Sequence, residues 1–412
     1  MFLETLLEFK SNPFVLVGIS TLLSYWASVR LQPVVILLSR QKNLMDEPGE
    51  RSSHKQRVPT YGGVAMFIAF TILVLSLISF VGFPPEDLNI VLSLMAAISI
   101  LFFLGIKDDL IGLMPSRKFI GQLLAASLVI FIGDIRIESL DGIFGIGELP
   151  YTVSVLFSIF VYLLMTNAYN LIDGIDGLAG TIGVLSSLIF GFFFLMDGST
   201  AMAIVSFVLT GTLLGFLRFN LSDARKLFMG DSGSLFIGFL LAFQAIVFLN
   251  ANLIQNPPSL VSNAPVLVLS IFSFPLIDTL RVFTLRALKG LSPFSPDRNH
   301  IHHHLLDKGL DHKQATTLIA AKSLLIITIS WMLQDISIHI HLFTMMVLGF
   351  VIYLVDLAFR RRLAKVVNET NDPKADEATP TLTKLEPKAM VRPADQTEKR
   401  AESVRETAAV GD

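Results

Sequence analysis

The chain has 412 residues, of which 52% are hydrophobic and 16% are charged, and its formal net charge at pH 7 is -2. A soluble domain carries about a quarter charged residues, so this composition excludes an ordinary soluble protein and favours a membrane protein. The sequence contains no cysteine, which excludes disulfides, thiolate nucleophiles and cysteine metal sites.

Apolar runs of membrane-spanning length fill most of the chain. A helix needs roughly 20 apolar residues to cross a bilayer, and about eleven runs meet this requirement. They lie at 13–38, 62–82, 89–106, 119–133, 150–168, 178–196, 199–218, 232–250, 264–286, 316–334 and 338–359. The sequence therefore predicts an all-α polytopic membrane protein with about eleven transmembrane helices.

Basic residues are concentrated in alternate connections between these runs. The first such connection carries Arg40, Lys42, Arg51, Lys55 and Arg57, and later alternate connections continue the pattern. The positive-inside rule then puts the N-terminus outside and the C-terminus in the cytoplasm. The same topology brings four acidic or histidine-rich clusters to the cytoplasmic side, where they could form one composite site.

Two segments differ from the apolar runs. Residues 134–149 alternate apolar and polar positions around Asp141-Gly142, which predicts a small β-hairpin on the outer face. Residues 361–412 contain no aromatic residue and are rich in polar types, so we expect a disordered cytoplasmic tail. The membrane domain is accordingly predicted to be residues 1–360.

Asp108 and Asp109 directly follow an apolar run. Neighbouring carboxylates repel each other, so they need a cation, a proton or water nearby. A metal-phosphate site or a catalytic base explains such a pair, and a solvated helix end balanced by Lys107 explains it equally well.

Asn170, Asp173 and Asp176 recur every third residue, so consecutive members lie near each other on a helix end. A polar turn is the alternative, but the density of polar groups favours a functional site. Asp231 begins the apolar run that follows Phe228-Met229-Gly230. It could be a helix N-cap or a ligand that holds a divalent metal against a phosphate.

Four histidines, His300, His302, His303 and His304, fall within five residues and follow Arg298. Zinc binding is one interpretation, but the spacing matches no familiar zinc site and the loop is basic. Binding of a phosphate or another oxyanion fits these donors better.

Two further features are weaker. A basic loop enters the second apolar run through Gly62-Gly63, which suggests a phosphate cradle or a positive-inside anchor. Asp278 and Arg281, three residues apart within an apolar run, are most simply interpreted as a buried structural pair.

Taken in order, five motifs resemble those of the polyprenyl-phosphate N-acetylhexosamine-1-phosphate transferases. The motifs are Pro-Thr-x-Gly-Gly at 59–63, Asp-Asp at 108–109, Asn-x-x-Asn-x-x-Asp-Gly-x-Asp-Gly at 167–177, Phe-x-Gly-Asp-x-Gly-Ser at 228–234 and His-x-His-His at 300–303. The resemblance covers roughly residues 40–315, and residues 292–300 look like the branch that initiates envelope glycans.

The resemblance implies transfer of a sugar-1-phosphate, expected to be N-acetylglucosamine-1-phosphate, from a UDP-N-acetylhexosamine to undecaprenyl phosphate, with release of UMP. It implies Mg²⁺ as cofactor, with Mn²⁺ as a substitute, and a multi-pass protein of the bacterial inner membrane with a cytoplasmic active site. A lipid bilayer is the expected environment, no nucleic-acid partner is expected, and a homodimer is compatible with the sequence.

The resemblance also assigns roles on the metal and nucleoside side. It implies that Asp231 and Asn170 bind the metal and that Phe228 stacks the uracil. Asp176 is expected to contact the nucleoside, and Asp173 to lie at the reaction centre.

On the phosphate side, Lys55 and Thr60 match nucleotide positions and Lys118 matches a phosphate-binding lysine. Asp108 and Asp109 are the catalytic pair, acting as base, nucleophile or orienting groups. Arg298 and the histidine cluster would bind the sugar or the pyrophosphate.

Two alternatives remain at this point. Within the same chemistry, the acceptor could receive phospho-N-acetylmuramoyl-pentapeptide, the reaction that makes lipid I. From another class, a lipid or solute transporter would also have many helices, but transporters place charges near the midplane and often show internal repeats.

Overall fold

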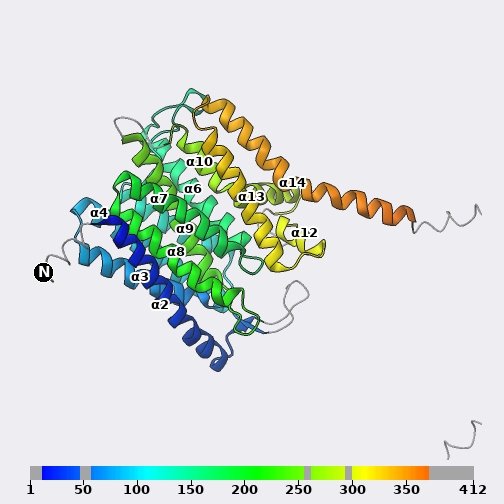
Figure 1. Ribbon diagram of the computed structural model, residues 1–412, viewed down its shortest axis with the longest axis horizontal. Helices are drawn as coiled ribbons and strands as arrows, with labels where there is room; N and C mark the ends of the chain where they lie inside the picture. Colours follow the sequence, from blue (N-terminus) through cyan, green and yellow to red (C-terminus); the bar gives the residue numbers. More distant parts are fainter. Residues whose placement is uncertain (1–11, 47–56, 255–260, 293–298, 371–412) are drawn as a thin grey trace, which may run out of the picture. The chain divides into compact units, whose positions relative to one another are not determined.

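A computed structural model describes residues 12–46, 57–254, 261–292 and 299–370 of the chain. Helices account for almost all of the regular structure (Figure 1). They are α2 (Pro13–Gln41), α3 (Gly62–Val81), α4 (Pro85–Ile111), α5 (Pro115–Phe131), α6 (Tyr151–Ile172), α7 (Leu178–Asp197), α8 (Thr200–Asn220), α9 (Asp231–Ile254), α10 (Ala264–Ile271), α11 (Ser273–Leu288), α12 (Ile301–Asp307), α13 (His312–Met332) and α14 (Ile338–Thr370). The protein is thus an all-α polytopic membrane protein, as predicted.

Nine helices in the described ranges are long and apolar enough to cross a membrane. The pair α10 and α11 makes a tenth if it counts as one span, although it is bent by 70°. The remaining predicted span is α5, whose 17 residues reach about 26 Å, slightly less than a hydrocarbon core of about 30 Å. The count of eleven spans and the side of each terminus stay predictions.

The predicted run at 264–286 is a broken helix and not a continuous one. Pro275 has no N–H to donate to the carbonyl oxygen of Ile271, four residues earlier, and its ring also crowds that carbonyl. Helix α10 therefore ends at Ile271, and α11 begins at Ser273 in a new direction. The break places the polar residues of α11 beside the histidine cluster.

Helix α9 lies in the middle of the bundle (Figure 1) and packs most extensively against α4 and α6. In its most apolar stretch 89% of the residues are buried, against 22% in α14. Helix α2 packs along α8 at close range, because Ser24 and Ser28 face Gly211 and Gly215. The N-terminal end of α9 carries Asp231 and packs closely against Gly63 of α3 and Gly105 of α4.

The hairpin expected at 134–149 is reduced to a single antiparallel bridge, between Ser139 and Glu148. Asp141 and Gly142 do form the tight turn that the sequence predicts, with φ of 54° and 88°. A second turn at Phe144 and Gly145 follows directly, so these residues cannot pair as strands. A two-stranded ribbon occurs instead on the site side, where β1 (Met45–Asp46) pairs with β2 (Val58–Pro59).

The C-terminal helix is longer than predicted. Helix α14 continues to Thr370, so residues 361–370 of the expected tail are helical, and residues 371–412 lie outside the described residues. The first of the two units into which the chain divides ends at Arg361. The site residues described below all belong to that unit.

We expect a protein truncated near Lys365 to keep most of its catalytic activity, because the removed residues contain none of the five motifs. Enzymatic rate per folded molecule, compared with the full chain, measures this. A truncated protein with a normal melting temperature and little activity would contradict the prediction.

Candidate active site

A cavity of about 690 Å³ gathers the acidic motifs at one end of the bundle. Its lining includes four carboxylates, from Asp109, Asp173, Asp176 and Asp231, which reach it from the ends of α4, α6 and α9 and from the loop after α6. Residues more than 100 positions apart in the sequence thus meet at one place. The predicted convergence of the acidic clusters is present in the structure.

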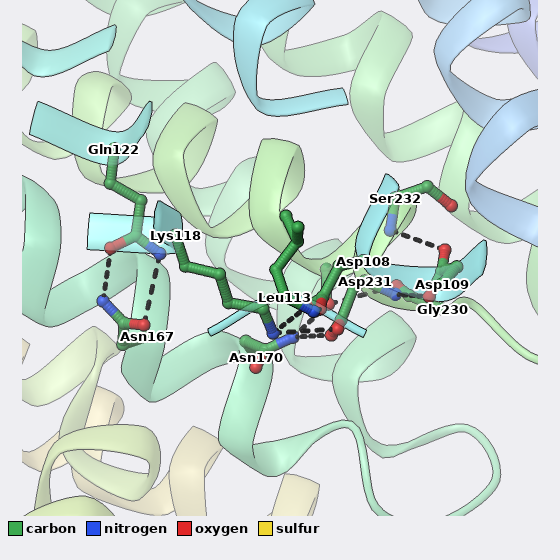
Figure 2. A network of polar contacts seen from close by, with 11 residues as sticks. Asp108, Asp109, Leu113, Lys118, Gln122, Asn167, Asn170, Gly230, Asp231 and Ser232 are labelled. Carbon is green, nitrogen blue, oxygen red and sulfur yellow. Dashed lines mark hydrogen bonds and ion pairs between the residues drawn. The ribbon is translucent and has the colours of Figure 1, made fainter. Parts of the chain in front are cut away.

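Lys118 lies between two aspartates, Asp108 and Asp231, of which Asp231 lines this cavity (Figure 2). Its Nζ forms an ion pair with Asp108 and donates to Asp231 Oδ2 at 2.9 Å. Asp231 Oδ1 accepts from the Asn170 amide at 2.5 Å, and Asp108 Oδ1 accepts the Leu113 N–H at 2.6 Å. A single ammonium group therefore balances two carboxylates from α4 and α9.

The other member of the Asp pair has a different role. Asp109 accepts the N–H of Asp231 at 2.8 Å through Oδ1 and the N–H of Ser232 at 3.0 Å through Oδ2. The first N–H groups of a helix have no partner within the helix and attract negative charge. Asp109 therefore caps α9 from a neighbouring helix, and both of its oxygens are occupied.

Gly62 and Gly63 do not form the predicted open phosphate cradle. Their N–H groups donate to the carbonyl oxygens of Phe228 and Met229, each at 2.9 Å. A Cβ at Gly63 would overlap the backbone of Gly233. The two glycines therefore let the start of α3 pack directly against the segment that carries Phe228 and Asp231.

Asp173 is the C-cap of α6 and lines the acidic cavity. Removal from bulk water, together with the negative charges of Asp231, Asp109 and Asp176, raises the pKa of Asp173 well above its ordinary value. A cation bound in the cavity would reverse this effect and favour the carboxylate form.

Asp176 is held by two residues that the sequence motifs do not contain. Its Oδ2 lies 2.6 Å from Lys226 Nζ and 2.8 Å from His312 Nδ1, and Thr316 donates to its carbonyl oxygen at 2.8 Å. Burial raises the pKa of Asp176, but hydrogen bonds and charge from His312 and Lys226 outweigh it and lower the pKa. The only sequence signal for these partners was an ionisable residue at the end of an apolar run.

A second cavity, of about 910 Å³, adjoins the first and is mostly apolar. Phe119, Leu156 and Phe160 line one part of it and are 51%, 63% and 58% exposed. Its polar lining includes Lys118, Gln122, Asn167, Arg286 and the histidines 300, 302 and 303. Asn170, Gly174 and His303 line both cavities, so the two meet there.

The histidine cluster is positioned by α11. Asp278 lies 2.7 Å from His300 Nδ1, and the Arg281 guanidinium donates to the Asn299 carbonyl oxygen. The prediction that Asp278 pairs with Arg281 is therefore wrong, because Asp278 contacts His300, which directly precedes α12. Arg281 Nη2 also lies 3.3 Å from His304 Nε2, on the other side of the cluster.

His302 is 1% exposed and packs on the loop that carries Asp173 and Asp176. A Cβ at Gly174 would overlap His302 Nε2, so only glycine leaves room for this ring. Burial, opposed by the charge of Asp278, lowers the pKa of His302 to about 3. His302 is therefore neutral at pH 7 and can act on a ligand through a hydrogen bond but not through charge.

The remaining predicted site residues are distributed as follows. Thr60 and Phe228 line the acidic cavity, and Lys226 Nζ lies 5.7 Å from the centroid of the Phe228 ring. Lys55 and Arg298 lie outside the described residues, so their expected contacts are untested.

Known proteins are similar in sequence to this chain. The model of glycosyl transferase family 4 matches residues 91–249. An Escherichia coli K12 protein named undecaprenyl-phosphate alpha-N-acetylglucosaminyl 1-phosphate transferase is 30% identical over 300 residues, which are 71% of this chain and 77% of the relative. The chain belongs to glycosyl transferase family 4.

Other members of the family support the assignment. A Mycolicibacterium smegmatis protein named decaprenyl-phosphate N-acetylglucosaminephosphotransferase is 34% identical over 292 residues, 66% of this chain and 71% of the relative. A Salmonella typhi undecaprenyl-phosphate alpha-N-acetylglucosaminyl 1-phosphate transferase is 30% identical over 310 residues, 73% of this chain and 80% of the relative. This chain is therefore a transferase, and the transporter alternative is removed.

We expect the purified transferase, washed with a chelator, to contain no stoichiometric zinc. Asp278, His300 and His302 have ligand atoms within 4.8 Å of one another, but both Asp278 oxygens already accept hydrogen bonds, from His300 and from the Ile301 N–H. Metal analysis by mass spectrometry measures this. One tightly held zinc per chain, lost in His302→Ala, would overturn the hydrogen-bonded interpretation.

Proposed function

We propose that the protein transfers N-acetylglucosamine-1-phosphate from UDP-N-acetylglucosamine to undecaprenyl phosphate. An oxygen of the lipid phosphate would attack the phosphorus bonded to the sugar, the bond from that phosphorus to the UMP oxygen would break, and UMP would leave. The names of the relatives support the sugar and the lipid class.

The observation that carries the proposal is the junction of two unlike cavities. A polyprenyl phosphate needs an apolar groove open to lipid that ends in cationic and hydrogen-bonding groups, and the larger cavity has both. A nucleotide sugar needs a polar cavity open to water, and the acidic cavity is such a cavity. It meets the apolar cavity at Asn170, Gly174 and His303. The two reacting phosphates would meet at that junction.

The donor set of the acidic cavity fits a divalent cation. Four carboxylates and the Asn170 amide line it, and such oxygen ligands suit Mg²⁺ and Mn²⁺. A pyrophosphate could not approach this negative surface without added positive charge. Asp231 and Asn170 would hold the ion, and the bound ion would neutralise charge on the donor pyrophosphate.

The protein side chains would mainly position and balance charge. A phosphomonoester has a second pKa of about 6, so the lipid phosphate is mostly dianionic at neutral pH and needs little help from a base. Lys118 would exchange its contact with Asp231 for a phosphate oxygen. Asp109, occupied as the cap of α9, would act as an orienting group, and Asp108 would hold Lys118 in place.

On the nucleotide side, Phe228 would stack on the uracil and Asp176 would contact the nucleoside, with Thr60 and Lys55 nearby. Asp176 would then exchange part of its contact with Lys226 or His312 for the ligand. Asp173 would lie beside the reacting phosphates, and the histidine cluster with Arg298 would bind the sugar or the pyrophosphate.

The protein is a multi-pass membrane protein, and we place it in the bacterial inner membrane with the active site in the cytoplasm. The basic connections favour this orientation. It would start a cell-envelope glycan, either as a monomer or as a homodimer.

A panel of UDP-sugars tests the proposal, with undecaprenyl phosphate, Mg²⁺ or Mn²⁺, and purified protein. We expect UDP-N-acetylglucosamine to give the fastest UMP release, together with a lipid-linked sugar product. Omission of the lipid phosphate should stop UMP release, which separates transfer from hydrolysis. Preference for UDP-N-acetylmuramyl-pentapeptide, or no release with any donor, would reject it.

A further inference from the structure

A buried carboxylate on α11 holds the first residue of the histidine cluster. Asp278 is 0% exposed, its Oδ2 lies 2.7 Å from His300 Nδ1, and its Oδ1 accepts the Ile301 N–H at 2.8 Å. Both oxygens are thus engaged by two consecutive residues at the start of α12. A buried carboxylate with two such partners fixes the direction of the residues that it binds.

This contact determines which nitrogen of His300 can meet a ligand. A ring nitrogen that hydrogen-bonds to a carboxylate carries the proton, so Nδ1 of His300 is the protonated nitrogen. Nε2 is then the nitrogen available to a ligand. His300 lines the apolar cavity together with Lys118 and Arg286, where the proposed lipid phosphate would lie.

The same contact also fixes α12 against the acidic loop. His302 follows His300 by two residues, its ring stacks on the ring of His300 with centroids 5.4 Å apart, and it packs on Gly174. Asp278 therefore orients a rigid group of rings that reaches from the acceptor cavity to the loop with Asp173.

We propose that Asp278 is a positioning residue for the transfer reaction, which holds the Nδ1 proton of His300 and presents Nε2 to the phosphate of the lipid acceptor. This inference rests on the proposed function and adds a residue that lies in none of the five motifs. Asp278 touches no substrate, and its effect passes through His300.

Asp278→Asn keeps the volume of the side chain but has one acceptor oxygen for two donors. If its NH₂ group faces His300, the ring must accept at Nδ1 and carry its proton on Nε2, the opposite tautomer. A change of this kind in a catalytic histidine lowers kcat by up to about 10⁴-fold. We expect a loss of at least about 10-fold in kcat, with the KM for the UDP-sugar changed little, because His300 lines the acceptor cavity.

A double-mutant cycle with His300→Asn tests the route of the effect. The asparagine amide nitrogen can replace Nδ1 as the donor to Asp278, whereas nothing replaces Nε2. In this background, Asp278→Asn should cost no more than about 2-fold further, because the nitrogen that Asp278 presents is already gone. Melting temperatures of all three variants report whether they fold.

The proposal would be overturned if the loss of kcat in the double variant equalled the product of the losses in the two single variants. Asp278 would then act independently of His300. An Asp278→Asn variant with normal kcat would overturn it as well. An inactive wild type across the donor panel would reject the proposed function itself, and this role with it. An active wild type with independent losses would reject the role of Asp278 alone.

Discussion

Asp231→Asn is expected to lower Mg²⁺-dependent UMP release by roughly 10³-fold while the protein stays folded. Asp231 is the first residue of α9, its side chain contacts Lys118 and Asn170, and Asp109 caps the helix. Asn has the same size and leaves that cap in place, so the start of α9 should be preserved. The variant loses the negative charge that pairs with Lys118 and that would bind the cation. A loss of about 4 kcal/mol of charge stabilisation corresponds to this factor.

UMP release and melting temperature, measured side by side on the same preparation, check this prediction. Asp311→Asn is the matched control, since Asp311 caps α13 through a hydrogen bond to the Gln314 N–H and lines neither cavity described above. The control should keep wild-type activity and stability. Near-normal release by the Asp231 variant at ordinary Mg²⁺ would remove this residue from the metal site.

Gly63→Ala is expected to damage both stability and activity, although it adds only one methyl group. The new Cβ would overlap the backbone nitrogen and Cα of Gly233 and the backbone of Ser232, none of which can rotate away. Helix α3 would have to move from the start of α9. Overpacking of this kind costs about 1–3 kcal/mol, and the displaced Asp231 should reduce transfer by more than about 10-fold.

Gly18→Ala in α2 provides the control, because a Cβ at Gly18 meets no atom within 4 Å. Alanine is also the better helix former, so this variant should be at least as stable as the wild type. Detergent-solubilised melting temperatures and UMP release distinguish the two variants. Equal behaviour of both would show that the close approach of α3 and α9 is unimportant.

The sequence predicted the class of fold and the convergence of the acidic motifs because both leave local signals. Apolar runs mark spanning helices, and ionisable residues at their ends are rare enough to point to function. The broken span also had a signal, since Pro275 lies in the middle of a run that was assigned as one helix. Only its consequence, a bend of 70°, required the structure.

Pairings between distant residues could not be predicted. Asp109 caps a helix that begins 122 residues later, and Asp176 binds His312, 136 residues away. No spacing rule relates such positions, because packing of several helices brings them together. Asp278 is an example. Its neighbour Arg281 suggested a local pair, whereas its partner in the structure is His300, 22 residues away.

The cap that Asp109 provides for α9 has a consequence for motion. The amide protons of Asp231 and Ser232 are bonded to a carboxylate at the end of the most enclosed of the spans found in the described residues. Exchange of such protons with solvent requires the central helix to separate from α4, which is close to global opening. Unlike sites carried on pliable surface loops, the proposed site at this end of α9 has the rigidity of the bundle core, so it can hold charge in a fixed place between one turnover and the next.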